Sequence, residues 1–185
     1  MVSRLYMVRH GRAEAGFGEA MDPALDALGR SQAEAVAAKL APLGPLPIFS
    51  SPLRRTRQTA APLAALWNRP PVIEDAVAEI PSPKGMTLEE RVVWLRTLMA
   101  GTWRDVPREL AQWREACIAA AVAKHDDCVI FSHFIAINVL AGAATDDDRL
   151  VVFSPDNCSV TVFETGGAAL RLVERGAEAS LTKVN

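Results

Sequence analysis

Short apolar runs alternate with stretches of helical periodicity through most of the chain, and this alternation constrains the fold more than any other feature. The apolar runs predict buried strands at residues 3–8, 46–51, 70–75 and 128–132. Helical spacing of apolar residues follows at residues 26–44, 52–67, 106–125 and 134–144. Strands that alternate with helices predict an α/β fold, a three-layer α/β/α sandwich whose mostly parallel sheet carries helices on both faces.

The C-terminal part of the chain has a different pattern. Residues 149–154, 159–165 and 169–175 alternate or run apolar over strand lengths, and Gly166 and Gly167 separate the last two runs. Two strands joined by so short a glycine-containing link predict a hairpin. We therefore expect the sheet to end in an antiparallel edge.

Local signals mark the ends of two helices. Asp26 is the expected N-cap of the helix at residues 26–44, and Gly44 its expected stop. Pro52 is expected in the first turn of the next helix. Residues 76–102 carry several prolines and tryptophans, and we expect a helical flap at about residues 80–105 that covers part of the molecule.

Length and composition exclude several classes of function. The 185 residues suit one domain over residues 1–185, and a net charge of -2 without a basic stripe argues against a nucleic-acid partner. The longest apolar stretch is interrupted by Ser132, His133 and Asn138, so it predicts a strand and a helix rather than a membrane span. Three cysteines without a C-x-x-C motif and a short apolar N-terminal run predict a cytoplasmic protein without a membrane partner.

Three polar motifs follow three of the predicted strands. Arg9, His10 and Gly11 follow the first, "SSPLRRTRQT" follows the second, and Ser132 with His133 ends the strand at residues 128–132. Ligands of open parallel sheets bind beyond the carboxyl ends of the strands. A single histidine or arginine has an ordinary structural explanation, but arginines and histidines gathered at one sheet edge, beside a helix N-terminus, favour an anion site.

These motifs resemble those of the histidine phosphatase superfamily, also called the phosphoglycerate mutase-like family. "VRHG", "DPALDALGRSQA", "SSPLRRTRQTA" and "VIFSH" occur in the family order, and the resemblance spans residues 4–164. It implies a phosphoglycerate mutase-like fold in which His10 is the nucleophile and forms a phosphohistidine. It also implies that Arg9, Arg55 and His133 hold the phosphoryl oxygens, and that Gly11 lets the backbone approach the phosphate.

A general acid is needed to protonate the leaving oxygen, and the resemblance places a carboxylate after the third strand. Glu79 is the best positional match. Glu74 and Asp75 are alternatives. The competing explanation is that such a residue is simply an exposed loop glutamate without a catalytic role. To act as an acid, Glu79 needs a pKa raised by partial burial.

The chain departs from the family pattern at two positions. Many members carry an asparagine five residues after the glycine of the R-H-G motif, whereas this chain has Gly16, so Arg12 is a candidate replacement for that phosphate contact. Phe134 stands where the family usually has glycine after the second histidine. It is a candidate wall of the substrate pocket.

The segment after Glu79 bears on the substrate. It lacks the acidic and aromatic block of the phosphoglycerate mutases, and Met86, Trp94 and Met99 predict a less polar leaving-group pocket, unless they are simply the core of the flap. We therefore expect a phosphatase that acts without a metal or other cofactor on a small-molecule phosphomonoester. A protein phosphohistidine phosphatase, a mutase and a non-catalytic phosphate-binding module are the alternatives, and the chain is expected to be a monomer or a homodimer.

Overall fold

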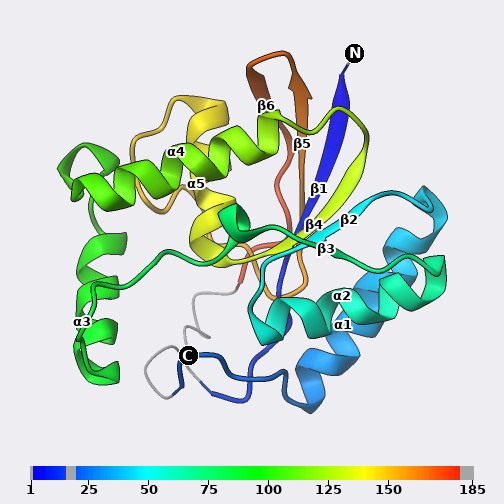
Figure 1. The fold of residues 1–185 in the computed structure, drawn as a ribbon, viewed down its shortest axis with the longest axis horizontal. Coiled ribbons are helices and arrows are strands. Elements are labelled where there is room, and N and C mark those ends of the chain that lie inside the picture. Colours follow the sequence, from blue (N-terminus) through cyan, green and yellow to red (C-terminus); the bar gives the residue numbers. More distant parts are fainter. Residues whose placement is uncertain (1, 16–19, 180–185) are drawn as a thin grey trace.

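A computed structural model describes residues 2–15 and 20–179, and in this part of the chain six strands form one sheet (Figure 1). The spatial order is β3-β2-β4-β1-β5-β6. The strands are β1 (Ser3–Arg9), β2 (Ile48–Ser50), β3 (Val72–Ile73), β4 (Cys128–Ser132), β5 (Val160–Gly166) and β6 (Ala169–Glu174). The first four are parallel, and β5 and β6 form the antiparallel edge. The predicted α/β class is confirmed.

Helices cover both faces of this sheet. They are α1 (Ala27–Leu40), α2 (Arg54–Trp67), α3 (Leu88–Met99), α4 (Arg108–Val122) and α5 (Phe134–Thr145). The pair α1 and α2 lies on one side of the sheet and the pair α4 and α5 on the other, while α3 stands apart (Figure 1).

Two apolar clusters explain these layers. Successive side chains of a strand point to opposite faces, so Val8 of β1 packs with Leu63 of α2, whereas Met7 packs with residues of α4 and α5. Strand β4 is buried along its whole length, and α5 is buried from Ile135 to Gly142. Apart from Ser132 and Asn138, the buried residues of these two elements therefore lack the alternation of apolar and polar side chains.

Helix ends match the sequence signals in one case and differ in two. Asp26 caps α1, because its Oδ1 accepts the N–H of Gly29 at 2.7 Å. Helix α1 ends at Leu40, and a 3₁₀ turn separates it from Gly44. The placement of Pro52 was wrong: α2 begins at Arg54, with Leu53 as its N-cap.

The strand predicted at residues 149–154 does not form. The side-chain oxygen of Asn138 accepts the N–H groups of Val152 and Phe153 at 2.7 and 3.0 Å, which leaves them unavailable to a strand partner. The predicted hairpin of β5 and β6 is confirmed, although its turn consists of Gly167, at a φ of 64°, and Ala168, and Gly166 still pairs with Ala169.

The register of the parallel strands brings the three polar motifs together. Arg9 is level with Ser132 across the β1–β4 pair, and Ser50 is level with Phe131 across the β2–β4 pair. The residues that follow these strands therefore meet at one edge of the sheet. Among residues 2–15 and 20–179, no helix has the length and apolar character needed to cross a membrane.

Candidate active site

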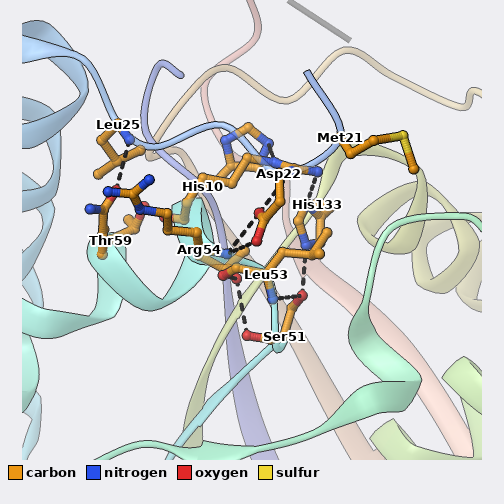
Figure 2. Close-up of polar contacts among 12 residues, drawn as sticks. His10, Met21, Asp22, Leu25, Ser51, Leu53, Arg54, Thr59 and His133 are labelled. Atoms are coloured by element: carbon orange, nitrogen blue, oxygen red, sulfur yellow. Dashed lines mark hydrogen bonds and ion pairs between the residues drawn. The ribbon is translucent and has the colours of Figure 1, made fainter. Parts of the chain in front are cut away.

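Backbone hydrogen bonds fix the residues that follow the strands. The N–H of His10 donates to the carbonyl of Ser132 at 3.0 Å, and the N–H of Ser51 donates to the carbonyl of Phe131 at 3.0 Å. Each bond continues the strand pairing by one residue beyond the strand end. His10, Ser51 and His133 are thus held on a rigid backbone at the sheet edge (Figure 2).

The Arg55 side chain links the two histidines. Its Nε–H donates to Nε2 of His10 at 3.2 Å, and its Nη2 lies 3.1 Å from Nδ1 of His133. The two imidazole rings meet edge to face, with 5.2 Å between their centroids. Arg55 lies in the first turn of α2, which explains how a helix that follows β2 reaches residues that follow β1 and β4.

The hydrogen bonds select one tautomer for each imidazole. His10 Nδ1 lies 2.8 Å from the carbonyl of Gly11, so Nδ1 carries the proton and Nε2 carries the lone pair. His133 Nε2 lies 2.8 Å from Oγ of Ser51, to which it donates while Nδ1 accepts from Arg55 (Figure 2). Both rings are therefore neutral.

Burial and neighbouring cations favour this neutral state. Desolvation, followed by the charges of Arg55 and Arg9, holds the pKa of His10 well below its ordinary value. The pKa of His133 is also well below its ordinary value, first through burial and then through His10 and the two arginines. A neutral imidazole with a directed lone pair is a nucleophile near neutral pH.

Arg9 presents a donor to the same space. Its Nη1 donates to the carbonyl of Pro155 at 2.8 Å, and its guanidinium lies 5.2 Å from the centre of the Phe134 ring. Its Nε–H is buried and has no hydrogen-bond partner in the part of the chain that the structure describes. Burial lowers the pKa of Arg9, although Glu79 and Asp156 oppose this effect. An unpaired buried donor on a cation suits an anionic oxygen.

Glu79 approaches this cluster from the segment after β3. Its Oε1 accepts the N–H of Ile80 at 3.1 Å and the N–H of Ile135, at the start of α5, at 3.2 Å. Burial raises the pKa of Glu79, while those hydrogen bonds and the two arginines oppose the shift. The alternatives lie elsewhere: Glu74 forms an ion pair with Lys124 at 2.9 Å, and Asp75 is exposed.

Gly11 is required by packing against α1. A Cβ on Gly11 would lie 2.6 Å from the carbonyl oxygen of Gly29. The N–H of Gly11 donates to Oγ1 of Thr59 at 3.0 Å. The side chain of Arg12 is half-exposed and pairs with Asp26. Gly16 lies outside the described residues.

A pocket of about 390 Å³ opens beside Arg55 and Glu79. Met86 contributes to its wall as predicted, but Arg12, Trp94, Met99 and Phe134 are not among its lining residues. Trp94 and Met99 pack against the core instead, and Phe134 lies against Arg9. The remaining lining residues are Met21, Leu53, Ile80, Pro81, Ser82, Pro83, Lys84, Gly85 and Arg91. The lining combines apolar side chains with the cations of Arg55, Lys84 and Arg91, and a less polar leaving-group pocket stays a prediction.

Three further residues support the site without having been predicted. The carboxylate of Asp22 accepts the N–H of Arg54 at 2.8 Å and lies 3.7 Å from Nη1 of Arg55 (Figure 2). Asn157 donates to the carbonyl of His10 at 2.9 Å. Thr59 could have been found, because it lies one helical turn after Arg55 on the same face. Asp22 could also have been found, because it opens the "DPALDALGRSQA" block that carries the family resemblance, whereas Asn157 lies on a loop without such a signal.

Among known proteins, two relatives match part of the chain. The glucosyl-3-phosphoglycerate phosphatase of Mycolicibacterium vanbaalenii is 43% identical over 82 residues, which are 42% of this chain and 36% of that protein. A PE-PGRS family protein of Mycobacterium tuberculosis is 44% identical over 79 residues, 40% of this chain and 14% of that protein. The match therefore spans well under two thirds of the length of either relative.

Solved structures match almost the whole chain. A mycobacterial glucosyl-3-phosphoglycerate phosphatase in complex with VO3 has a TM-score of 0.72 and 25% identity, and the match covers 95% of this chain and 100% of that one. A phosphoserine phosphatase from Entamoeba histolytica, in complex with 3-phosphoglyceric acid, has a TM-score of 0.75 and 21% identity over 95% and 97% of the two chains, a likeness of fold. Residues 5–177 match the family model of the histidine phosphatase superfamily, branch 1, and the chain belongs to this family.

Proposed function

We propose that this chain hydrolyses phosphomonoesters in two displacements through a phosphohistidine on His10, without a metal ion. The observation that carries the proposal is the state of His10, which is neutral and directs the lone pair of Nε2 toward Arg55. Membership of the histidine phosphatase superfamily and the phosphatase relatives support the same reaction class.

In the first displacement, a phosphoryl oxygen takes the hydrogen bond that Arg55 Nε–H gives to His10, and the freed lone pair of Nε2 attacks phosphorus as the bond from phosphorus to the leaving oxygen breaks. The Nδ1–H bond to the carbonyl of Gly11 stabilises the positive charge that develops on the ring. Phosphoryl transfer depends mainly on in-line positioning and on charge around the non-bridging oxygens. Arg9 and Arg55 supply the donors in this account, and His133 can donate only when its Nε2–H exchanges Ser51 for a phosphoryl oxygen. Gly11 stays a candidate for backbone contact with the phosphate.

Glu79 supplies the proton. Oε1 is occupied by two backbone N–H groups, so in this proposal Oε2 carries the proton that passes to the leaving oxygen. The elevated pKa of Glu79, caused first by burial, favours the protonated form needed for this step. The departing alcohol is then neutral, and Glu79 is left as a carboxylate.

The second displacement returns the enzyme to its starting state. A water molecule attacks the phosphohistidine as the Glu79 carboxylate removes one of its protons. The bond from phosphorus to Nε2 breaks, its electron pair returns to His10, and inorganic phosphate leaves. The same carboxyl group thus acts first as an acid and then as a base.

A small molecule is the substrate that this site favours, and we place the reaction in the cytoplasm. The pocket beside Arg55, lined by residues 79–86 and by Arg91, has a volume of about 390 Å³, which is within the range of small-molecule sites. The odd number of cysteines, without a C-x-x-C motif, supports this placement.

The test is phosphate release from a panel of phosphomonoesters and one phosphohistidine peptide, without added metal and with a chelator present. The wild-type chain is compared with His10→Ala and with Lys39→Ala, a matched change at an exposed position of α1. We expect turnover of small esters that disappears in His10→Ala and persists in Lys39→Ala.

Other outcomes would redirect the assignment. Preferential turnover of the peptide would make the chain a protein phosphohistidine phosphatase. Turnover that survives in His10→Ala would contradict the covalent mechanism. Absence of turnover in folded protein would favour a mutase or a non-catalytic phosphate-binding module.

A further inference from the structure

The peptide group between His10 and Gly11 is bonded at both ends to side chains from distant parts of the chain. Its carbonyl oxygen accepts Nδ2–H of Asn157 at 2.9 Å, and its N–H donates to Oγ1 of Thr59 at 3.0 Å. The C=O and N–H of a trans peptide group point in opposite directions. Asn157 and Thr59 therefore hold this peptide group from two sides, although neither side chain takes part in the two displacements.

The next carbonyl along the chain, that of Gly11, controls the His10 ring. It accepts Nδ1–H at 2.8 Å, which keeps the lone pair on Nε2. In the first displacement the hydrogen bond from Arg55 passes to a phosphoryl oxygen, so the Gly11 carbonyl must hold the ring while positive charge develops on it. The position of this carbonyl depends on the backbone angles of Gly11, which has no side chain to restrict them. A fixed peptide group before Gly11 limits that freedom.

The hydrogen bonds of Thr59 make it an acceptor for this peptide group. Thr59 lies on α2 one turn after Arg55, it is fully buried, and its hydroxyl donates to the carbonyl of Arg55 at 2.7 Å. Because that bond uses the hydroxyl proton, Oγ1 is left to accept, and it accepts the N–H of Gly11. The same turn of α2 thus fixes both Arg55 and the peptide group of the nucleophile.

Asn157 is held in place because its neighbours pair with the end of β1. The N–H of Cys158 donates to the carbonyl of Arg9 at 3.0 Å, and the N–H of Arg9 donates to the carbonyl of Ser159 at 3.2 Å. Cys158 has a φ of 54°, which is uncommon for a residue other than glycine and costs free energy. Residues in such conformations cluster at functional sites. This one turns the chain directly after the residue that reaches His10.

We propose that Asn157 and Thr59 are positioning residues for the transfer of the phosphoryl group to His10. Their hydrogen bonds act on the His10–Gly11 peptide group, and through it on the distance between the Gly11 carbonyl and Nδ1 of His10. When either bond is lost, the carbonyl moves more freely, the Nδ1–H bond weakens, and the positive charge on the ring is less stabilised during the attack. This inference rests on the proposed function and adds two residues to those expected from the sequence.

The kinetic test uses single-turnover conditions, with the enzyme in excess of a phosphomonoester and with rapid quenching at high pH. Thr59→Val keeps the shape of the side chain but leaves the buried N–H of Gly11 without its acceptor, so phosphorylation of His10 should slow about 5- to 100-fold. Asn157→Ala should slow it about 2- to 10-fold, the range for one ordinary hydrogen bond. Thr59→Ser, which keeps the hydroxyl, should restore most of the rate. The enzyme concentration that gives half of the maximal rate should stay close to the wild-type value, since neither bond involves the substrate.

A second measurement needs no turnover. The Nδ1–H proton of His10 gives an NMR signal whose position and exchange with solvent report the strength of its hydrogen bond to the Gly11 carbonyl. We expect this signal to shift upfield and to exchange faster in Thr59→Val and Asn157→Ala than in the wild type, and to stay unchanged in Thr59→Ser. Its absence from His10→Ala assigns it.

The matched control is Thr161→Val on β5. Thr161 is also fully buried, and its Oγ1 also accepts a backbone N–H, that of Gly176 at 3.3 Å. The control therefore loses the same kind of bond, but one that does not hold the His10–Gly11 peptide group. It should lose stability in denaturant unfolding, while its phosphorylation rate and its Nδ1–H signal remain those of the wild type.

Several results would overturn this inference alone. They are a wild-type rate or a wild-type Nδ1–H signal in Thr59→Val or Asn157→Ala, a Thr59→Ser variant as slow as Thr59→Val, and a Thr161→Val variant as slow as either. Absence of a phosphohistidine from folded wild-type protein would instead overturn the proposed function. The NMR signals would then decide by themselves whether Asn157 and Thr59 hold the His10 ring.

Discussion

Helix α1 packs against the loop that carries His10, and this contact sets the position of the nucleophile. The Gly29→Ala variant tests this directly. A Cβ on Gly29 would overlap the carbonyl oxygen of Arg12 and lie 2.9 Å from its carbonyl carbon and its nitrogen. Arg12 is two residues from His10, and backbone atoms cannot rotate away as a side chain can. The loop or the helix must therefore move.

The size of the effect follows from these contacts. Ordinary contacts between carbon atoms are about 3.5 to 4.0 Å, so the backbone of Arg12 must shift by about 1 Å. Overpacking of this kind costs about 1–3 kcal/mol, partly offset by up to about 1 kcal/mol from the better helix propensity of alanine. A displacement of about 1 Å in a reacting group lowers the rate by about 100-fold.

The assay measures kcat on one phosphomonoester and the free energy of unfolding by denaturant. Ser31→Ala is the control, because it raises helix propensity at an exposed position of α1 without a new contact. Gly29→Ala should lose about 100-fold in kcat while most of the protein stays folded. A variant with wild-type kcat would refute the claim that this contact positions His10.

Three other perturbations probe the same site. Glu79→Gln should slow hydrolysis of alkyl esters by about 100- to 10,000-fold and aryl esters far less, because only poor leaving groups need the proton; equal losses would remove Glu79 from the acid role. Ser51→Ala should lower kcat/KM by roughly tenfold because it leaves the buried Nε2–H of His133 without its acceptor, whereas an unchanged kcat/KM would mean that this bond does not orient the ring. Burial, aided by the nearby arginines, lowers the pKa values of His10 and His133, so the unfolded chain binds protons below pH about 6.5 that the folded chain does not. Stability should be full above that pH and fall below it by up to about 1.4 kcal/mol per pH unit for each histidine. Denaturant unfolding at a series of pH values measures this slope, which a variant with both histidines replaced by asparagine should flatten.

Much of the fold could be predicted because the local sequence patterns and the register of the parallel strands indicate the same arrangement. An apolar run followed by Arg9 and His10 is a strand that ends in polar residues, and the same is true of the run before His133. Carboxyl ends of neighbouring parallel strands meet at one edge. The grouping of these residues with Arg55 therefore follows from sequence order once a parallel sheet is assumed.

The wrong predictions involve side chains that interact with residues distant from them in the sequence. Residues 149–154 have a strand pattern, but the amide of Asn138 takes the hydrogen bonds that a strand would need. In α3 the apolar residues Trp94, Leu95, Leu98 and Met99 pack against the core, but Arg91 is buried as well and Val93 is exposed. The pocket wall was predicted from the helical spacing of apolar residues, which does not indicate where a cation such as Arg91 lies.

The central claim is that a phosphoryl group resides on Nε2 of His10 during turnover, and rapid quenching tests it most directly. The chain is mixed with excess phosphomonoester, quenched at high pH within one turnover because the phosphorus–nitrogen bond is labile to acid, and digested for mass mapping. The account predicts one phosphoryl group, found on the peptide that contains His10 and absent from the His10→Ala variant. Turnover without a phosphorylated peptide, or a phosphoryl group found on His133 instead, would contradict it.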